Sequence, residues 1–263
     1  MYIHNLDPTL LSIGPLEIRY YGLVYVLGFF LMIWWMFYWR KKGNLKLTKD
    51  DIWDFGFYLM LGVLIGSRVF EIFWEPSLYL KNPLNLLKFW QGGMSFHGGF
   101  VGIVLAAHLY CKKKQLNFWK LADLLSIPAI FALALGRIAN FINGELVGRI
   151  TTVDWCVQFP NYSDCRHPST LYAAGKRFLV FGGLLWLSFK NELYKFKPGF
   201  IFWNFVFWEG LGRIIVDFYR QNNLFLGVSL GQWFSLIMVM VALIVFLKYH
   251  QKDWKRLLRI KNS

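Results

Sequence analysis

The residues best suited to chemistry lie in one short stretch, Gly136–Arg149, whose sequence is GRIANFINGELVGR. This stretch ends a long apolar segment. Its polar side chains are Arg137, Asn140, Asn143, Glu145 and Arg149. Charged and amide side chains at the edge of hydrocarbon are costly unless they are paired or hydrated, and they mark functional sites by default. The stretch is therefore the first candidate for a site.

The composition indicates which kind of protein must position these residues. The chain has 263 residues, of which 56% are hydrophobic and only 17% are charged. We therefore expect an all-α polytopic membrane protein forming a single domain over residues 1–263, rather than a soluble all-α protein. The net charge of +14 is typical of cytoplasmic loops rich in Lys and Arg, so no nucleic-acid partner is expected. The scattered His and Cys residues predict no metal site and no other cofactor.

A helix that crosses a bilayer needs about 20 mostly apolar residues. Seven segments of the chain approach this pattern. They are residues 20–38, 55–74, 94–110, 121–141, 171–187, 200–218 and 229–247. The third segment is short, and Lys176 and Arg177 interrupt the fifth.

The basic residues predict the orientation of these segments. Clusters of Lys and Arg follow the first, third, fifth and seventh segments, as in the run Lys112–Lys114, and the other loops contain few. The positive-inside rule then places the N-terminus outside and the C-terminus in the cytoplasm. A short outer loop at about residues 146–168 contains Cys156 and Cys165. These two cysteines either pair in an oxidising compartment or stay reduced, and the sequence leaves both open.

With this orientation, polar side chains from several segments fall near the outer ends. They include Tyr21, Arg68, His97, Arg137, Asn140, Glu209, Arg213, Asp217 and Gln232. We therefore predict a polar cavity at the depth of the outer leaflet. Arginines suit a phosphate group, and the depth suggests the phosphate of a lipid. His97 could accept or donate a proton, since an unperturbed imidazole has a pKa of about 6.5.

Each polar residue also has a simpler explanation. Glu209, Arg213 and Asp217 are spaced by four and could form a structural ion ladder. Arg68 and Glu71 could form an intrahelical pair.

Three further features of the predicted cavity also have simpler explanations. Tyr21 could be an ordinary interface aromatic, and His97 could be structural. Gly98-x-x-x-Gly102 indicates a packing seam of small residues. The agreement of several helices at one depth favours the cavity over these separate explanations.

Several sequence blocks resemble those of bacterial prolipoprotein diacylglyceryl transferases. They are IRYYGLVYVLGF (residues 18–29), GGMSFHGGFVG (92–102), GRIANFINGELVGR (136–149), RHPSTLY (166–172) and GRIIVDFYR (212–220). The resemblance spans nearly the whole chain and implies seven transmembrane helices with the N-terminus outside. It also implies transfer of a diacylglyceryl group from phosphatidylglycerol to the lipobox cysteine of a prolipoprotein signal peptide, at the bacterial inner membrane. A thioether would form and glycerol phosphate would leave.

The resemblance also implies roles for individual residues. His97 matches the essential histidine of the family and Arg213 a functional arginine, so both are expected to be catalytic. Arg137 is expected to hold the phosphatidylglycerol headgroup. Further matches to substrate-binding positions are Tyr21, Asn140, Glu145 and Gly148. The working hypothesis is that His97 assists deprotonation of the cysteine thiol, and the competing one is that another base does so while His97 orients the lipid.

The chain departs from the family pattern at a few positions. Glu209 stands where a tyrosine is usual, and we expect it to pair with Arg213 and weaken the hold of Arg213 on phosphate. Thr170 and Ala173 replace a usual glutamine and glutamate.

Two other functions compete with the transferase. A lipid-binding or lipid-moving protein would use the same arginines without covalent chemistry. A small-solute transporter is less favoured, because the sequence has no internal repeat.

Overall fold

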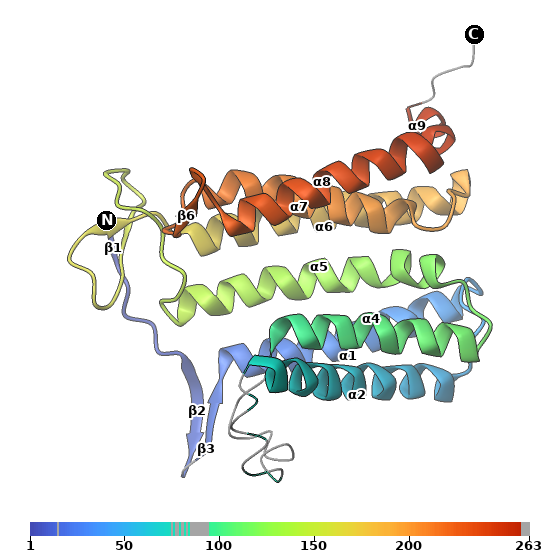
Figure 1. The fold of residues 1–263 in the computed structure, drawn as a ribbon, viewed down its shortest axis with the longest axis horizontal. Coiled ribbons are helices and arrows are strands. Elements are labelled where there is room, and N and C mark those ends of the chain that lie inside the picture. The colour runs from blue at the N-terminus through green and yellow to red at the C-terminus, as the bar shows by residue number, and fades with distance from the viewer. Residues whose placement is uncertain are drawn as a thin grey trace. The chain divides into compact units, whose positions relative to one another are not determined.

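The computed structural model describes residues 1–14, 16–74, 76, 79, 82, 84 and 95–258 (Figure 1). These residues divide into two compact units, which are described separately. The first unit comprises Met1–Met32 and Ala122–Ser263, and the second comprises Ile33–Leu121. The start of the predicted third segment at Met94, and the first three residues of the GGMSFHGGFVG block, lie outside the described residues.

Each of the seven predicted segments coincides with a helix of at least 18 residues in the described part of the chain. The helices are α1 (Tyr20–Lys41), α2 (Lys49–Trp74), α4 (Phe96–Lys113), α5 (Phe118–Ile142), α6 (Ser169–Tyr194), α7 (Phe200–Asp217) and α8 (Leu230–Tyr249). A short helix, α9 (Gln251–Leu257), follows. Lys176 and Arg177 do not interrupt α6, which continues through both residues. The helical prediction is confirmed.

Four of these helices are long and apolar enough to cross a membrane, namely α1, α2, α5 and α8. Two of the other helices carry several charged residues, since α6 contains Lys176 and Arg177 and α7 contains Glu209, Arg213 and Asp217. The chain is thus a mostly helical membrane protein, and seven crossings stay a prediction.

Helix α8 shows the surface that such a protein presents to lipid. Its buried side includes Val239, Ala242 and Phe246. Large apolar side chains occupy the exposed side, among them Ile237, Met240, Ile244 and Leu247. An apolar face of this extent suits hydrocarbon better than water.

In the second unit, glycines bring α2 and α4 into close contact. Gly62 and Gly66 of α2 lie against Gly98 and Gly102 of α4. A Cβ atom added at Gly62 would lie 2.6 Å from the carbonyl oxygen of Gly102, and one added at Gly102 would overlap the carbonyl of Gly62. The packing seam predicted from Gly98-x-x-x-Gly102 is confirmed, and α2 supplies a matching pair with the same spacing.

In the first unit, α5 holds the start of α7. Both carboxylate oxygens of Asp123 in α5 accept backbone N–H groups, from Gly199 at 2.7 Å and from Phe202 at 2.8 Å. A carboxylate at this position satisfies N–H groups that have no partner within the helix. Helix α7 in turn packs against α6 and α8 (Figure 1).

Short strands order the chain outside the helices. The strands are β1 (Tyr2–Ile3), β2 (Thr9–Ile13), β3 (Leu16–Arg19), β4 (Val157–Gln158), β5 (Cys165–Arg166), β6 (Leu224–Phe225) and β7 (Val228–Ser229). β4 pairs with β1 in parallel and with β5 antiparallel, β2 with β3, and β6 with β7.

The loop between α5 and α6 has its own small core and a disulfide. Val147, Val157 and Phe159 are buried together, with Phe141 of α5 packed against them. Cys156 and Cys165 form a disulfide, with their Cα atoms 5.5 Å apart. The pairing that the sequence left open is therefore made, and the loop leads into α6 as an ordered segment.

The glycine seam makes a stability prediction. We expect Gly102→Ala to lower the free energy of unfolding by about 1–3 kcal/mol, because the added methyl group forces α2 and α4 apart. Gly99→Ala is the matched control, since its Cβ would make only an ordinary contact at 3.7 Å with Val63. Chemical unfolding in detergent micelles compares the two variants. Equal stability of both would contradict a tight seam at Gly102.

Candidate functional site: a cationic pocket on α5, α6 and α7

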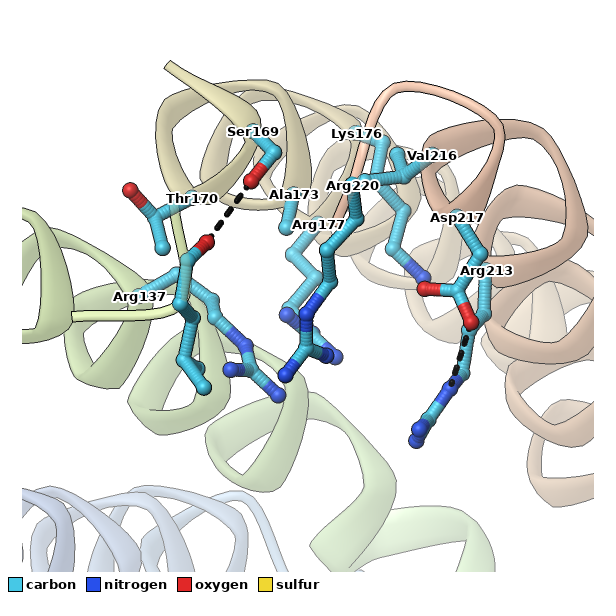
Figure 2. A pocket seen from close by; sticks show the side chains of 11 residues that line it. Arg137, Ser169, Thr170, Ala173, Lys176, Arg177, Arg213, Val216, Asp217 and Arg220 are labelled. Atoms are coloured by element: carbon cyan, nitrogen blue, oxygen red, sulfur yellow. Dashed lines mark hydrogen bonds and ion pairs between the residues drawn. The ribbon is translucent and has the colours of Figure 1, made fainter. Parts of the chain in front are cut away.

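A pocket in the first unit is lined by side chains from α5, α6, α7 and the loops beside them (Figure 2). The lining residues are Arg137, Leu146, Ser169, Thr170, Ala173, Lys176, Arg177, Arg213, Val216, Asp217 and Arg220. Five of them are cationic and one is a carboxylate. The pocket is therefore built for an anion.

Three of the arginines converge. Figure 2 shows the guanidinium groups of Arg137, Arg177 and Arg220 pointing toward one another, whereas that of Arg213 lies to one side, next to Asp217. The charges of Arg177, Arg220 and Arg213 all act on that of Arg137. Like charges held this close repel one another unless an anion lies between them.

Hydrogen bonds within the stretch that opened the sequence analysis orient Arg137. Its Nη1 donates to Oδ1 of Asn140 at 3.1 Å, and Nδ2 of Asn140 donates to Oε2 of Glu145 at 2.9 Å. Asn143 donates to the other oxygen of Glu145 at 3.1 Å. Arg137, Asn140 and Glu145 thus form one chain of contacts, with Asn140 buried in the middle.

The end of α5 explains why these side chains meet. The helix ends at Ile142, and Gly144 follows with a φ of 68° in the left-handed region. Such a residue reverses the backbone after a helix. The backbone N–H of Glu145 then bonds to the carbonyl of Asn140 at 3.0 Å, which brings the Glu145 side chain back toward the helix end.

Gly148 lies where three segments of backbone meet. Its N–H donates to the carbonyl of His167 at 3.1 Å, and it forms a bridge with Arg220. A Cβ atom at this position would overlap the His167 carbonyl and lie 2.8 Å from that of Tyr219. Glycine is thus the residue that allows Arg220 to reach the pocket. Arg220 is half-buried, and this burial lowers its pKa below the ordinary value for arginine.

Glu209 does not pair with Arg213, and that expectation is wrong. Its carboxylate instead binds two cations of the facing helix α6. Nζ of Lys176 donates to Oε2 at 2.6 Å, and Nη2 of Arg177 donates to Oε1. Spacing along one helix suggested the Arg213 pair, but side chains of the packed neighbouring helix reach the carboxylate first.

Asp217 and the start of α8 accompany Arg213. Nε of Arg213 lies 4.0 Å from Oδ2 of Asp217, and the same oxygen accepts a hydrogen bond from Ser229 at 2.7 Å. A Cβ atom added at Gly231 would lie 2.7 Å from Nη2 of Arg213, so this glycine leaves room for the guanidinium. Arg213 is thereby left to the pocket rather than to Glu209.

The residues that line this pocket do not include Tyr21, His97 or Arg68 of the predicted cavity. Tyr21 lies at the exposed start of α1, where its hydroxyl accepts a hydrogen bond from Tyr25 at 3.1 Å. His97 lies exposed in the first turn of α4, in the second unit. Arg68 of the same unit is buried and donates to the Tyr79 hydroxyl at 2.8 Å.

Sequence reasoning missed several lining residues, above all Lys176, Arg177 and Arg220. In the sequence, Lys176 and Arg177 interrupt a predicted span, and Arg220 ends the GRIIVDFYR block. The signal was present, because two adjacent cations in an apolar helix are expensive without a function.

The sequence is similar to those of known proteins along most of its length. The family model described as prolipoprotein diacylglyceryl transferase matches residues 8–248. A relative from Geobacter sulfurreducens is 39% identical over 251 residues, covering 92% of this chain and 95% of the relative. A relative from Nitrosomonas europaea is 40% identical, and the match covers 97% of this chain and 94% of the relative. A relative from Rickettsia rickettsii is also 40% identical, and the match covers 92% of this chain and 96% of the relative. All three are named phosphatidylglycerol–prolipoprotein diacylglyceryl transferase.

The chain belongs to the prolipoprotein diacylglyceryl transferase family. The resemblance read from the sequence blocks is confirmed. Within this family member, Arg137, Arg213, Asn140, Glu145 and Gly148 come together at one pocket or directly support it.

The pairing of Glu209 makes a second stability prediction. We expect Glu209→Gln to lower the free energy of unfolding by about 3–5 kcal/mol, because it leaves the charges of Lys176 and Arg177 without their carboxylate in a buried setting. The exposed pair between Glu17 and Arg19 supplies the control, and Glu17→Gln should change stability little. Denaturant titration of both variants in the same detergent measures the difference. If Glu209→Gln were as stable as Glu17→Gln, Glu209 would not be neutralising these cations.

Proposed function

We propose that this chain transfers the diacylglyceryl group of phosphatidylglycerol to the lipobox cysteine of prolipoprotein signal peptides. The observation that carries the proposal is the convergence of Arg137, Arg177 and Arg220 on one pocket of a membrane protein. Guanidinium groups bind the oxygens of a phosphate through paired N–H donors. The names of the relatives supply the lipid and the acceptor.

The proposed reaction is a nucleophilic displacement at carbon. The cysteine sulfur forms a bond to the glycerol carbon that carries the phosphate, and the carbon–oxygen bond to phosphate breaks. The electron pair of that bond stays on the phosphate oxygen, so glycerol phosphate leaves as a monoester. The thiol proton passes to a base. A thiol with a pKa near 8.5 is mostly protonated at neutral pH, so deprotonation speeds the step.

In this account Arg137 and Arg213 bind the phosphate and stabilise the negative charge that develops on it. Asn140 and Glu145 keep Arg137 in position, and Gly148 brings Arg220 to the pocket. His97 accepts the thiol proton, and Tyr21 contributes to lipid binding. The roles of His97 and Tyr21 rest on the family resemblance.

The pocket faces the outer leaflet of the bacterial inner membrane in this proposal, with seven spans and an outer N-terminus. The distribution of Lys and Arg supports this orientation. The disulfide between Cys156 and Cys165 supports it as well, because disulfides persist in oxidising compartments and this loop leads directly into the pocket.

A transfer assay tests the function. Purified protein receives phosphatidylglycerol and a lipobox peptide, and mass spectrometry follows the thioether product and released glycerol phosphate. We expect wild type to form both and Arg137→Ala to lose turnover at least about a hundredfold, since one donor to the developing charge is removed. Arg256→Ala, an exposed arginine of α9, is the control and should retain activity. Lipid binding or movement without product from wild type would identify a non-catalytic lipid protein instead.

The role of His97 has its own test. We expect His97→Gln to lower turnover by about a hundredfold or more while the KM for lipid changes little, because a proton acceptor contributes mainly to the chemical step. Rates are measured between pH 6 and pH 9 (about the range of thiol ionisation). Near-normal turnover of the variant across this range would assign the proton to another base.

A further inference from the structure

The pocket holds a cation that the family motifs did not indicate. Arg177 is only 4% exposed and lines the pocket from α6. Its Nη2 is held by Glu209, but its Nε and Nη1 are buried without a hydrogen-bond partner in the part of the chain that the structure describes. Buried N–H groups of a charged side chain are rarely left unpaired, since losing their hydration is costly. These two nitrogens are therefore donors directed into a pocket for an acceptor.

Thr170 also lines the pocket from α6. The residue is 3% exposed, and its buried hydroxyl has no hydrogen-bond partner among the described residues. Thr170 and Arg177 are seven residues apart and so lie on the same face of α6. Figure 2 shows the Thr170 hydroxyl pointing away from the guanidinium groups, so the unsatisfied donors that α6 places beside Arg137 and Arg220 are those of Arg177.

The charge of the pocket exceeds what a lipid phosphate needs. Five cationic side chains and the two carboxylates of Glu209 and Asp217 leave a formal charge of +3. The phosphodiester of phosphatidylglycerol carries one negative charge. A phosphate monoester carries about −1.5 to −2 at pH 7, because its second pKa is about 6. The pocket therefore matches the leaving group better than the intact lipid.

We propose that Arg177 is a further catalytic residue, which binds the phosphate as it becomes a monoester and so favours the leaving group over the intact diester. The inference rests on the proposed function, because the reaction there converts a diester into a monoester. Glu209 is the positioning residue for this step. By binding Nη2, it holds the other two nitrogens of Arg177 toward the pocket. An interaction stronger with the product-like charge than with the lipid raises turnover rather than lipid affinity.

Two soluble ligands separate the two charge states. Glycerol phosphate is the monoester product, and glycerophosphoglycerol is the diester headgroup without acyl chains. Isothermal titration calorimetry measures their binding to the full chain in detergent at fixed ionic strength. We expect wild type to bind the monoester more tightly at pH 8, and this preference to shrink at pH 5, where the monoester carries about one charge.

Arg177→Gln should weaken monoester binding by about ten- to hundredfold and diester binding by much less. Lys190→Gln removes a charge from the same helix outside the pocket and should leave both affinities unchanged. The double variant Arg177→Gln/Glu209→Gln keeps the net charge of the pocket at +3. It should remain weak for the monoester if Arg177 itself contacts the phosphate.

Two results would overturn the inference. One is that Arg177→Gln weakens the binding of both ligands equally or of neither. The other is that the double variant regains wild-type monoester affinity, which would show that the net charge of the pocket determines that affinity. The transfer assay on the same preparations separates this from the proposed function. If wild type is active and Arg177→Gln keeps the wild-type ligand preference, only the role proposed for Arg177 is refuted. If wild type forms no thioether product, the proposed transferase function is refuted.

Discussion

The convergence of Arg137, Arg177 and Arg220 on one pocket is the constraint around which the first unit is organised. Like charges in a partly buried space repel, and only two carboxylates offset five cations. A neighbouring contact keeps each of these arginines in place despite the repulsion. Asn140 binds Arg137, Glu209 binds Arg177, and the backbone contacts of Gly148 fix the segment that carries Arg220. Such an arrangement is stable in the presence of an anion, and a phosphate supplies one.

Much of the fold follows from the sequence because apolar periodicity and length dictate helices in a membrane protein. All seven predicted segments coincide with helices in the described residues. The α4 side of the glycine seam is also predictable, since glycines four apart permit close backbone approach, whereas its partner glycines in α2 come from the structure. The stretch Gly136–Arg149 was recognised as a site from polarity alone. Its hydrogen-bond chain from Arg137 to Glu145 then follows from the left-handed turn at Gly144.

The ion pairs between helices could not be predicted from the sequence. They depend on which faces of two helices pack together, and residue spacing along one helix does not show this. Glu209 and Arg213 are four apart, yet Glu209 binds Lys176 and Arg177 of α6. Those two cations were counted against a helix because they lower its hydropathy. Charged residues that line a pocket lower the hydropathy of the helix that carries them, as Lys176 and Arg177 do in α6. The disulfide likewise depended on loop geometry, which brings the Cα atoms of Cys156 and Cys165 to 5.5 Å.

An experimental structure with bound phosphatidylglycerol tests most directly whether this pocket binds the phosphate. We predict phosphate oxygens within hydrogen-bonding distance, about 2.7–3.2 Å, of guanidinium nitrogens of Arg137 and Arg177. Glu209 should still bind Lys176 and Arg177 in that complex. A headgroup bound elsewhere, with the nitrogens of Arg177 still unpaired, would contradict the account.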